Sequence, residues 1–260
     1  MQNLKVTLIQ ANQIWENKVA NYENYLQLIK KIEEPTDLII LPEMFDTGFS
    51  MNIKLAEDWK NNSSLEFLKR IASDNKAAIY TSLMTKENNL FYNRGVFVFP
   101  DGKVSYYDKR KSFGLGGEDK FFTAGTKETI VAYKNWNLNL QICYDLRFPE
   151  MARNFEEKGL PKYDLLLYVA NWPSKRAEHW KILLKARAIE NQTYVIGVNR
   201  VGNDNNGLTY SGDSMVIDSQ GSVENLLENQ LVCTTTLSKL TLNKTRVSLP
   251  FLRDYSMNYQ

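Results

Sequence analysis

Hydrophobic runs alternate with amphipathic stretches along the first third of the chain. "LKVTLIQA" reads as a strand, and "TDLIILPE" is a continuous apolar run of the kind buried on both faces of a sheet. Between them, residues 16–34 carry apolar side chains at helical spacing, at Val19, Tyr22, Tyr25, Leu26 and Ile29. A helix "SLEFLKRIASDNKA" and a strand "AAIYTSLM" follow. This alternation predicts an α/β protein in which helices cover a sheet.

Two β-hairpins interrupt the alternation. "NRGVFVFPDGKVSYYDKRK" contains two strand-like runs joined at "PDGK", and "SGDSMVIDSQGSVENLL" repeats the pattern later. Between them we expect a strand before Cys143, a helix beginning near "FPEMARNFEEKG" and the strand "YDLLLYVAN". A helix "AEHWKILLKARAIENQ" and a strand "YVIGVNRV" complete the series. The two halves look alike, which predicts two sheets packed face to face with helices outside, in one domain spanning residues 1–260.

Composition narrows the possible functions. Hydrophobic residues make up 43% of the 260, enough for a sizeable core, and charged residues make up 24%. The net charge of +2 offers no electrostatic reason to bind nucleic acid or an anionic membrane. No apolar run approaches the roughly 18 residues that a membrane-spanning helix needs. We therefore expect neither partner.

Two cysteines and one histidine limit the chemistry further. Two cysteines do not make a disulfide framework, and "MQNLKVTLIQAN" lacks the pattern of a signal peptide, so a cytoplasmic location is expected. A single histidine excludes His-rich zinc sites, and any Cys-His or Ser-His machinery would have to use His179. We expect no metal and no organic cofactor.

Cys143 stands where the apolar run "LNLQI" meets the predicted helix. Such a corner exposes a side chain at the carboxyl end of a sheet, where α/β folds place their sites. Backbone N–H groups there could bind an oxyanion and favour the thiolate. The alternative is a buried structural cysteine, the commoner state of a free cysteine.

Glu43 and Lys109 also follow strand-like runs. Glu43 comes directly after "LIILP", and an acid in such partly apolar surroundings suits proton transfer. Lys109 ends the second strand of the first hairpin and could supply a fixed cation for developing negative charge. Taken singly, each reads equally well as a solvated surface charge.

Together these three stretches resemble the nitrilase (carbon–nitrogen hydrolase) superfamily. "LPEMFDTGF", "YYDKRKSF" and "ICYDLRFPE" match the family's glutamate, lysine and cysteine motifs in chain order. The segment from "YVANWPSKRAEHW" to "VIGVNRVG" is similar over its whole length to the family's sequence after the cysteine. The resemblance covers roughly residues 4–251 and is strongest to the bacterial omega-amidase branch. It implies a four-layer α-β-β-α sandwich, which agrees with the two predicted sheets.

The resemblance also implies roles. Cys143 would be the nucleophile, Glu43 the proton carrier and Lys109 an oxyanion donor, together with the backbone N–H of Tyr144. Glu118, in "GGEDKFFTAG", would match a second glutamate that orients Lys109 and the substrate.

Several other residues are candidates for the site or for a structural role. Arg147 is a candidate to bind a substrate carboxylate, or else pairs with an acid such as Glu150. Asn171 and Trp172 follow an apolar strand and would wall the pocket, although Trp172 could equally pack between layers. His179 and Cys233 read as structural residues, His179 lying beside a helix face formed by Trp180, Leu183, Leu184 and Arg187.

The function expected from this resemblance is hydrolysis of a small amide, an omega-monoamide of a dicarboxylate such as 2-oxoglutaramate or 2-oxosuccinamate, through a cysteine thioester. One alternative is hydrolysis of N-carbamoyl amines or of another small amide or nitrile. A second is a non-catalytic binding or assembly module with the same fold. The tail, about residues 243–260, is rich in apolar and aromatic side chains. Packing on a partner subunit in a homodimer would explain it.

Overall fold

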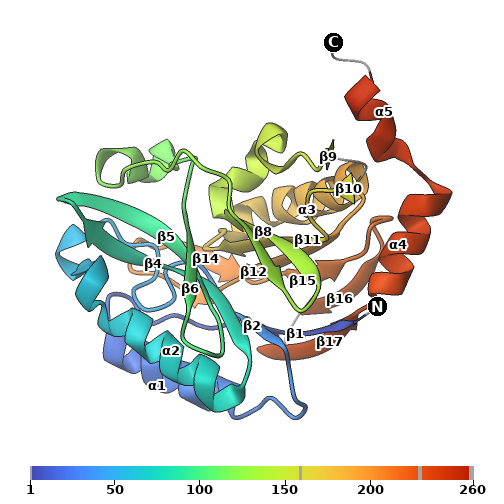
Figure 1. Ribbon diagram of the computed structural model, residues 1–260. Coiled ribbons are helices and arrows are strands. Elements are labelled where there is room, and N and C mark those ends of the chain that lie inside the picture. The colour runs from blue at the N-terminus through green and yellow to red at the C-terminus, as the bar shows by residue number, and fades with distance from the viewer. Residues whose placement is uncertain (1, 158–159, 228–229, 258–260) are drawn as a thin grey trace.

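Two large mixed sheets and their flanking helices form four layers in the order α-β-β-α (Figure 1). The computed structural model describes residues 2–157, 160–227 and 230–257. The first sheet has the strand order β17-β1-β2-β4-β5-β6, with the short β3 (Glu57–Asp58) paired to β4. Its strands are β17 (Val232–Leu237), β1 (Leu4–Ile9), β2 (Leu38–Ile40), β4 (Ala78–Glu87), β5 (Leu90–Val98) and β6 (Val104–Asp108).

The second sheet has the order β16-β15-β12-β11-β8-β7. Its strands are β16 (Val223–Leu227), β15 (Ser214–Ile217), β12 (Tyr194–Asn199), β11 (Leu165–Ala170), β8 (Trp136–Ile142) and β7 (Ile130–Tyr133). Two small ribbons pair β9 (Glu156–Glu157) with β10 (Leu160–Pro161), and β13 (Val201–Asn203) with β14 (Thr209–Ser211).

The two halves are built alike, as the sequence predicts. Strands β1, β2 and β4 are parallel, and so are β8, β11 and β12. Each parallel set is extended by an antiparallel hairpin, β5–β6 in the first sheet and β15–β16 in the second. Both predicted hairpins are therefore confirmed, and so is the sandwich of two sheets.

Continuous apolar strands are explained by burial on both faces. In β2, Leu38 and Ile40 point into the core between the two sheets, whereas Ile39 points toward the helices of the first sheet. In β1, Val6 and Leu8 likewise join the core between the sheets. Because alternate residues of a strand face opposite sides, a strand between two cores must be apolar throughout.

Helices α1 (Lys18–Ile29) and α2 (Ser63–Asn75) cover the outer face of the first sheet. Tyr22 of α1 stacks on Phe67 of α2, with ring centroids 4.4 Å apart. Tyr25 and Ile29 are buried, as helical spacing predicts, but Val19 in the first turn is 67% exposed. The buried face of α1 thus begins one turn later than the apolar pattern does.

Helix α3 (Ala177–Asn191) packs on the second sheet through Trp180 and Leu184. Gly197 of β12 allows this close approach, since a Cβ there would lie 2.5 Å from Leu184 Cδ1 and 2.6 Å from an indole carbon of Trp180. Arg187 lies on the same buried face, so the predicted face of this helix is confirmed.

The helix predicted near residues 148–159 is wrong. The chain forms two short 3-10 helices, Cys143–Arg147 and Pro149–Ala152, before β9. Two backbone carbonyls here accept hydrogen bonds from distant side chains, since Arg187 donates to Leu146 O at 2.6 Å and Arg110 donates to Met151 O at 2.9 Å. Residues 158–159 of the predicted helix lie outside the described residues.

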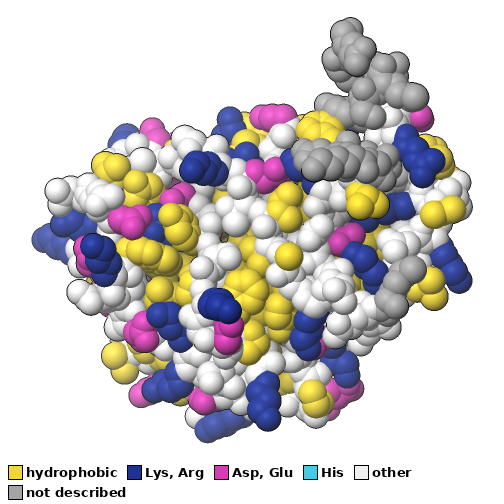
Figure 2. Space-filling view, in the orientation of Figure 1, with side chains coloured by type: hydrophobic (Ala, Val, Ile, Leu, Met, Phe, Trp, Pro, Cys, Tyr) yellow, Lys and Arg dark blue, Asp and Glu magenta, His cyan; other side chains and the backbone are white. Residues whose placement is uncertain are grey.

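The chain ends in α4 (Lys239–Ser248) and α5 (Phe251–Met257), and α5 projects from the body of the molecule in Figure 1. Residues 258–260 of the predicted docking tail lie outside the description. On the face drawn in Figure 2, charges of both signs are interspersed among hydrophobic patches. Among the described helices, none is long and apolar enough to cross a membrane.

Candidate active site

Cys143 directly follows β8, at the carboxyl end of a parallel strand. Its φ of 45° lies in the left-handed region, which non-glycine residues rarely adopt. Asp145 fixes this turn, because its Oδ2 accepts hydrogen bonds from Ile142 N at 3.0 Å and from Tyr107 Oη at 2.8 Å. The predicted strand-to-helix corner is therefore present, although the helix is of the 3-10 type. The turn presents the thiol to a pocket.

Asp145 is itself buried without an ion pair among the described residues. Burial raises the pKa of Asp145 to about 6, against hydrogen bonds from Ile142 N and Lys111 N that favour the charged form. The turn that carries Cys143 thus depends on a carboxylate whose charge is costly to bury.

Glu43 lies three residues after the end of β2, at the carboxyl end of this parallel strand. Its side chain is fully buried. Its Oε1 accepts hydrogen bonds from Lys109 Nζ at 2.9 Å and Asn93 Nδ2 at 2.8 Å, and its Oε2 accepts one from Asn171 N at 2.9 Å. The backbone is held as well, since Gln13 Nε2 and Asn171 Nδ2 both donate to Glu43 O. Together these hydrogen bonds hold the Glu43 carboxylate in one orientation.

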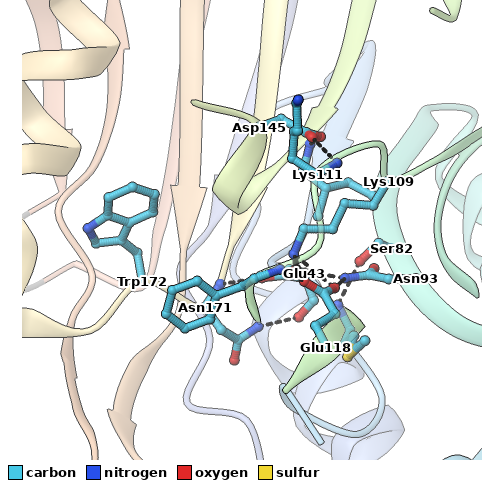
Figure 3. Close-up of polar contacts among 12 residues, drawn as sticks. Glu43, Ser82, Asn93, Lys109, Lys111, Glu118, Asp145, Asn171 and Trp172 are labelled. Atoms are coloured by element: carbon cyan, nitrogen blue, oxygen red, sulfur yellow. Dashed lines mark hydrogen bonds and ion pairs between the residues drawn. The ribbon is translucent and has the colours of Figure 1, made fainter. Parts of the chain in front are cut away.

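Lys109 follows β6 and reaches two carboxylates at once (Figure 3). Its Nζ lies 2.9 Å from Glu43 Oε1, and 3.0 and 2.9 Å from the two oxygens of Glu118. Burial alone would lower the pKa of Lys109, but the charges of Glu118 and Glu43 outweigh burial and raise it. Lys109 is therefore an ammonium ion. The structure brings Glu43, Lys109 and Glu118 into one buried cluster.

The environment of Cys143 favours its thiol form over the thiolate. Burial raises the pKa of Cys143 well above its usual range, and the charge of Glu43 raises it further, while Lys109 offsets only part of this. Desolvation therefore outweighs any backbone dipole that could have favoured the thiolate. A base that accepts the thiol proton is consequently needed for attack by sulfur.

A pocket of about 760 Å³ opens in front of this cluster. Cys143 is only 9% exposed, yet it lines the pocket. The predicted residues Tyr144, Arg147, Asn171 and Trp172 line it too, together with Phe49, Phe113 and Arg176. This volume is ample for a small substrate.

Arg147 is held over the ring of Trp172, with 4.7 Å from its Cζ to the ring centroid. Its Nη2 lies 3.3 Å from His179 Nδ1. In the described parts of the chain no ion pair joins Arg147 to Glu150 or to any other acid. The pairing that the sequence left open is thus not formed, and the guanidinium faces the pocket.

Trp172 has both of the roles that the sequence left open, as a pocket wall and as a packing residue. It walls the pocket, and it packs against Trp180 of α3 with ring centroids 5.4 Å apart. Figure 3 shows it beside Asn171, on the side away from Lys109. His179 and Cys233 lie outside the buried cluster. Cys233 is a half-buried free thiol in β17.

Sequence reasoning missed Asn93, Gln13, Asp145 and Arg176. Asn93 donates to both Glu43 and Glu118, at 2.8 and 3.0 Å. Two adjacent polar residues, Asn93 and Arg94, inside a hairpin strand whose other residues are mostly apolar were the available signal for Asn93. Asp145, two residues beyond the cysteine, could have been found by asking what holds a corner in place.

The model of the family described as carbon–nitrogen hydrolase matches residues 5–246. The chain belongs to the carbon–nitrogen hydrolase family. It is accordingly an enzyme that hydrolyses carbon–nitrogen bonds, as the resemblance implied.

Curated members of this family are similar over most of the chain. Omega-amidase YafV of Escherichia coli (strain K12) is 38% identical over 98% of this chain and 94% of its own length. Omega-amidase YafV of Yersinia enterocolitica is 42% identical, covering 86% and 85%. The 2-oxoglutaramate amidase of Paenarthrobacter nicotinovorans is 32% identical, covering 94% and 85%.

Solved structures of the family share the fold. A carbon–nitrogen hydrolase superfamily protein from Xanthomonas campestris, solved with an arsenic adduct in its active site, is 41% identical with a TM-score of 0.94 over 97% of both chains. Nit3 of Saccharomyces cerevisiae, a nitrilase superfamily member, is 25% identical with a TM-score of 0.85, covering 96% and 95%. The four-layer sandwich is thus that of the carbon–nitrogen hydrolases.

Proposed function

We propose that this enzyme releases ammonia from small omega-monoamides of dicarboxylates, of the 2-oxoglutaramate or 2-oxosuccinamate type, through a thioester on Cys143. The observation that carries the proposal is the ammonium of Lys109, held between Glu43 and Glu118 behind the thiol. The similarity to omega-amidases and to a 2-oxoglutaramate amidase supports the choice of substrate.

The first half of the reaction forms the thioester. Glu43 accepts the proton of the Cys143 thiol as Sγ attacks the amide carbon, which gives a tetrahedral intermediate. Lys109 Nζ makes three hydrogen bonds, one to Glu43 and two to the oxygens of Glu118. One of its three N–H groups can serve both oxygens of Glu118, which leaves an N–H for the oxyanion. The backbone N–H of Tyr144 is the second oxyanion donor. Glu43 then transfers its proton to the leaving nitrogen, the C–N bond breaks and ammonia departs.

The second half hydrolyses the thioester. Glu43 accepts a proton from a water molecule, whose oxygen attacks the thioester carbon. When the second tetrahedral intermediate collapses, the C–S bond breaks and Glu43 returns the proton to sulfur. The products are the dicarboxylate and a restored thiol. Glu118 and Asn93 keep Lys109 and Glu43 in position throughout.

Arg147 is the proposed partner of the free carboxylate of the substrate. It lines the pocket four residues after the nucleophile, and its guanidinium has no acidic partner within the described residues. A planar guanidinium can bind a carboxylate through two parallel hydrogen bonds. Arg147→Gln should therefore raise KM for an omega-monoamide and leave turnover of a neutral amide little changed.

The proposal also covers assembly and location. The exposed apolar residues of the tail, such as Val247 and Phe251 at 77% and 59% exposure, support a homodimer in which residues 243–260 pack on the partner. Two free thiols support a cytoplasmic location. A single domain over residues 1–260 is part of the same proposal.

A substrate panel tests the proposed function. Ammonia release is measured with 2-oxoglutaramate, succinamate, glutamine, asparagine, an N-carbamoyl amino acid and an aliphatic nitrile, using the wild type and Cys143→Ala as the background. Turnover of omega-monoamides that is lost in Cys143→Ala is the expected result. Turnover of the N-carbamoyl compound or the nitrile instead would overturn the substrate class. No turnover of any compound would favour a binding module.

A further inference from the structure

Arg176 is a second guanidinium in the wall of the pocket. It ends the 3-10 helix Ser174–Arg176 and lines the pocket together with Arg147 and Cys143. Its backbone is fixed, because Trp172 Nε1 donates to Arg176 O at 2.8 Å. The side chain therefore leaves a rigid corner directly before α3.

Both guanidiniums rest on aromatic rings of the same pocket. Arg176 Cζ lies 5.7 Å from the ring centroid of Phe113, and Arg147 Cζ lies 4.7 Å from that of Trp172. Stacking covers a face of a guanidinium and leaves the N–H donors in its plane for other partners. Phe113 is anchored to the buried cluster, since its N–H donates to Glu118 Oε2 at 2.6 Å. Aromatic residues thus hold both guanidiniums at the pocket, and Phe113 also contacts the buried cluster.

The acids of the pocket wall are occupied within the protein. Glu16 accepts hydrogen bonds from Ser50 Oγ at 2.5 Å and Asn52 Nδ2 at 3.1 Å. Asp204 accepts bonds at both of its oxygens, from two backbone N–H groups of its own loop and from Tyr210 Oη. By contrast, no ion pair to Arg147 or Arg176 occurs among residues 2–157, 160–227 and 230–257.

We propose that Arg176 is a second specificity-determining residue, which acts with Arg147 to bind the anionic end of the substrate and disfavours an ammonium beside that carboxylate. The inference rests on the proposed function, because it concerns the same pocket and the same substrates. Two cations near one carboxylate strengthen its binding, whereas an α-ammonium group in the same place meets like charge. Free amino-acid amides should therefore be poorer substrates than amides of the corresponding oxo or unsubstituted acids.

Three four-carbon amides separate these effects. Succinamate carries the carboxylate, asparagine adds an α-ammonium, and butyramide replaces the carboxylate by a methyl group. The value of kcat/KM is measured for each with the wild type, Arg176→Gln and Lys175→Gln. Lys175 is the matched control, because it is the adjacent residue of the same 3-10 helix, is exposed and does not line the pocket.

Arg176→Gln should lower kcat/KM for succinamate about tenfold or more and leave butyramide within about twofold. The preference for succinamate over asparagine should fall as well, since the repulsion of the ammonium is relieved. Arg176→Lys should restore part of the preference, because it returns the charge without the planar fork. Lys175→Gln should match the wild type for all three amides.

The outcomes distinguish this inference from the proposed function. If the wild type hydrolyses succinamate but Arg176→Gln behaves like Lys175→Gln, the proposed function stands and the role of Arg176 fails. An equal loss for all three amides in Arg176→Gln also overturns the inference, because it indicates a structural role. A wild type that hydrolyses butyramide and not succinamate overturns both.

Discussion

Lys109 Nζ lies 2.9 Å from Glu43 Oε1 and 2.9 Å from Glu118 Oε2, and all three side chains are buried. One ammonium thus forms ion pairs with two buried carboxylates. Its removal leaves uncompensated buried charge as well as an oxyanion without its donor. Stability and catalysis are therefore coupled at this single side chain.

Lys109→Met is expected to lower kcat by at least about 10² and the free energy of unfolding by about 3–5 kcal/mol. Ammonia release and urea unfolding measure the two effects. Lys103→Met is the matched control, because its side chain is 80% exposed on the hairpin turn and should change neither quantity. Near-normal turnover by Lys109→Met would remove this lysine from the mechanism.

Glu43→Gln tests the proton carrier. Because burial and the charge of Glu43 raise the pKa of Cys143, removing that charge should lower the pKa of the thiol. The pH midpoint of alkylation of Cys143 by iodoacetamide, followed by peptide mass analysis, should therefore move to lower pH. At the same time kcat should fall by about 10² or more, since the general base is lost.

Two controls accompany this measurement. Cys233 lies in β17, away from the cluster, and its alkylation should not change. Glu150→Gln makes the same substitution at an exposed position near Cys143 in the chain and should leave the midpoint in place. An unchanged midpoint in Glu43→Gln would show that this carboxylate does not act on the thiol.

Asp145 makes the stability of the fold depend on pH. Its pKa is raised to about 6 by burial, so the folded state binds the proton more tightly than the unfolded state does. Stability from this group is present below the unfolded pKa of about 4 and is lost as pH rises to about 6, by about 3 kcal/mol in total. Urea unfolding at several pH values should show this decline.

Asp145→Asn should lack that decline and be less stable at every pH in this range. An asparagine amide turns a donor toward one of the three groups that now donate to the carboxylate, which costs about 1–3 kcal/mol. The difference between the wild-type and variant curves isolates this group from other acids. A difference that does not vary between pH 4 and 6 would contradict the assignment.

Gly197→Ala tests the contact between β12 and α3. The added methyl group would lie 2.5 Å from Leu184 Cδ1, so the helix or the side chain must move. Such overpacking costs about 1–3 kcal/mol in unfolding free energy. Gly114→Ala is the control, because its methyl group would meet atoms no closer than 3.7 Å. Equal stability of the two variants would mean that the contact tolerates a methyl group.

The candidate site residues follow strands that the sequence pattern already indicates. Glu43 and Cys143 come just after the buried strands β2 and β8, at the carboxyl ends of parallel strands, where α/β folds place their sites. Lys109 instead follows the half-exposed antiparallel strand β6. Placing them in a single site needed the family motifs, since pattern alone does not tell which edges of two sheets meet.

The remaining features depend on contacts between distant residues. Asn93 is part of the cluster because its backbone pairs with Lys109, whose N–H donates to Asn93 O at 3.0 Å, and such pairing is not visible in a strand's own sequence. The helix expected near residues 148–159 is replaced by a short 3-10 helix, within which Met151 O accepts a hydrogen bond from the distant Arg110. Likewise, the pKa of Cys143 depends on how deeply the corner is buried.

The thioester on Cys143 is tested most directly by partitioning with hydroxylamine. Succinamate and monomethyl succinate differ only in the leaving group, so both should give the same succinyl thioester. Hydroxylamine and water then compete for that intermediate, and Cys143→Ala supplies the uncatalysed background. We predict one ratio of hydroxamate to succinate for both substrates. Ratios that differ between the two leaving groups would contradict a common thioester and indicate direct attack by water.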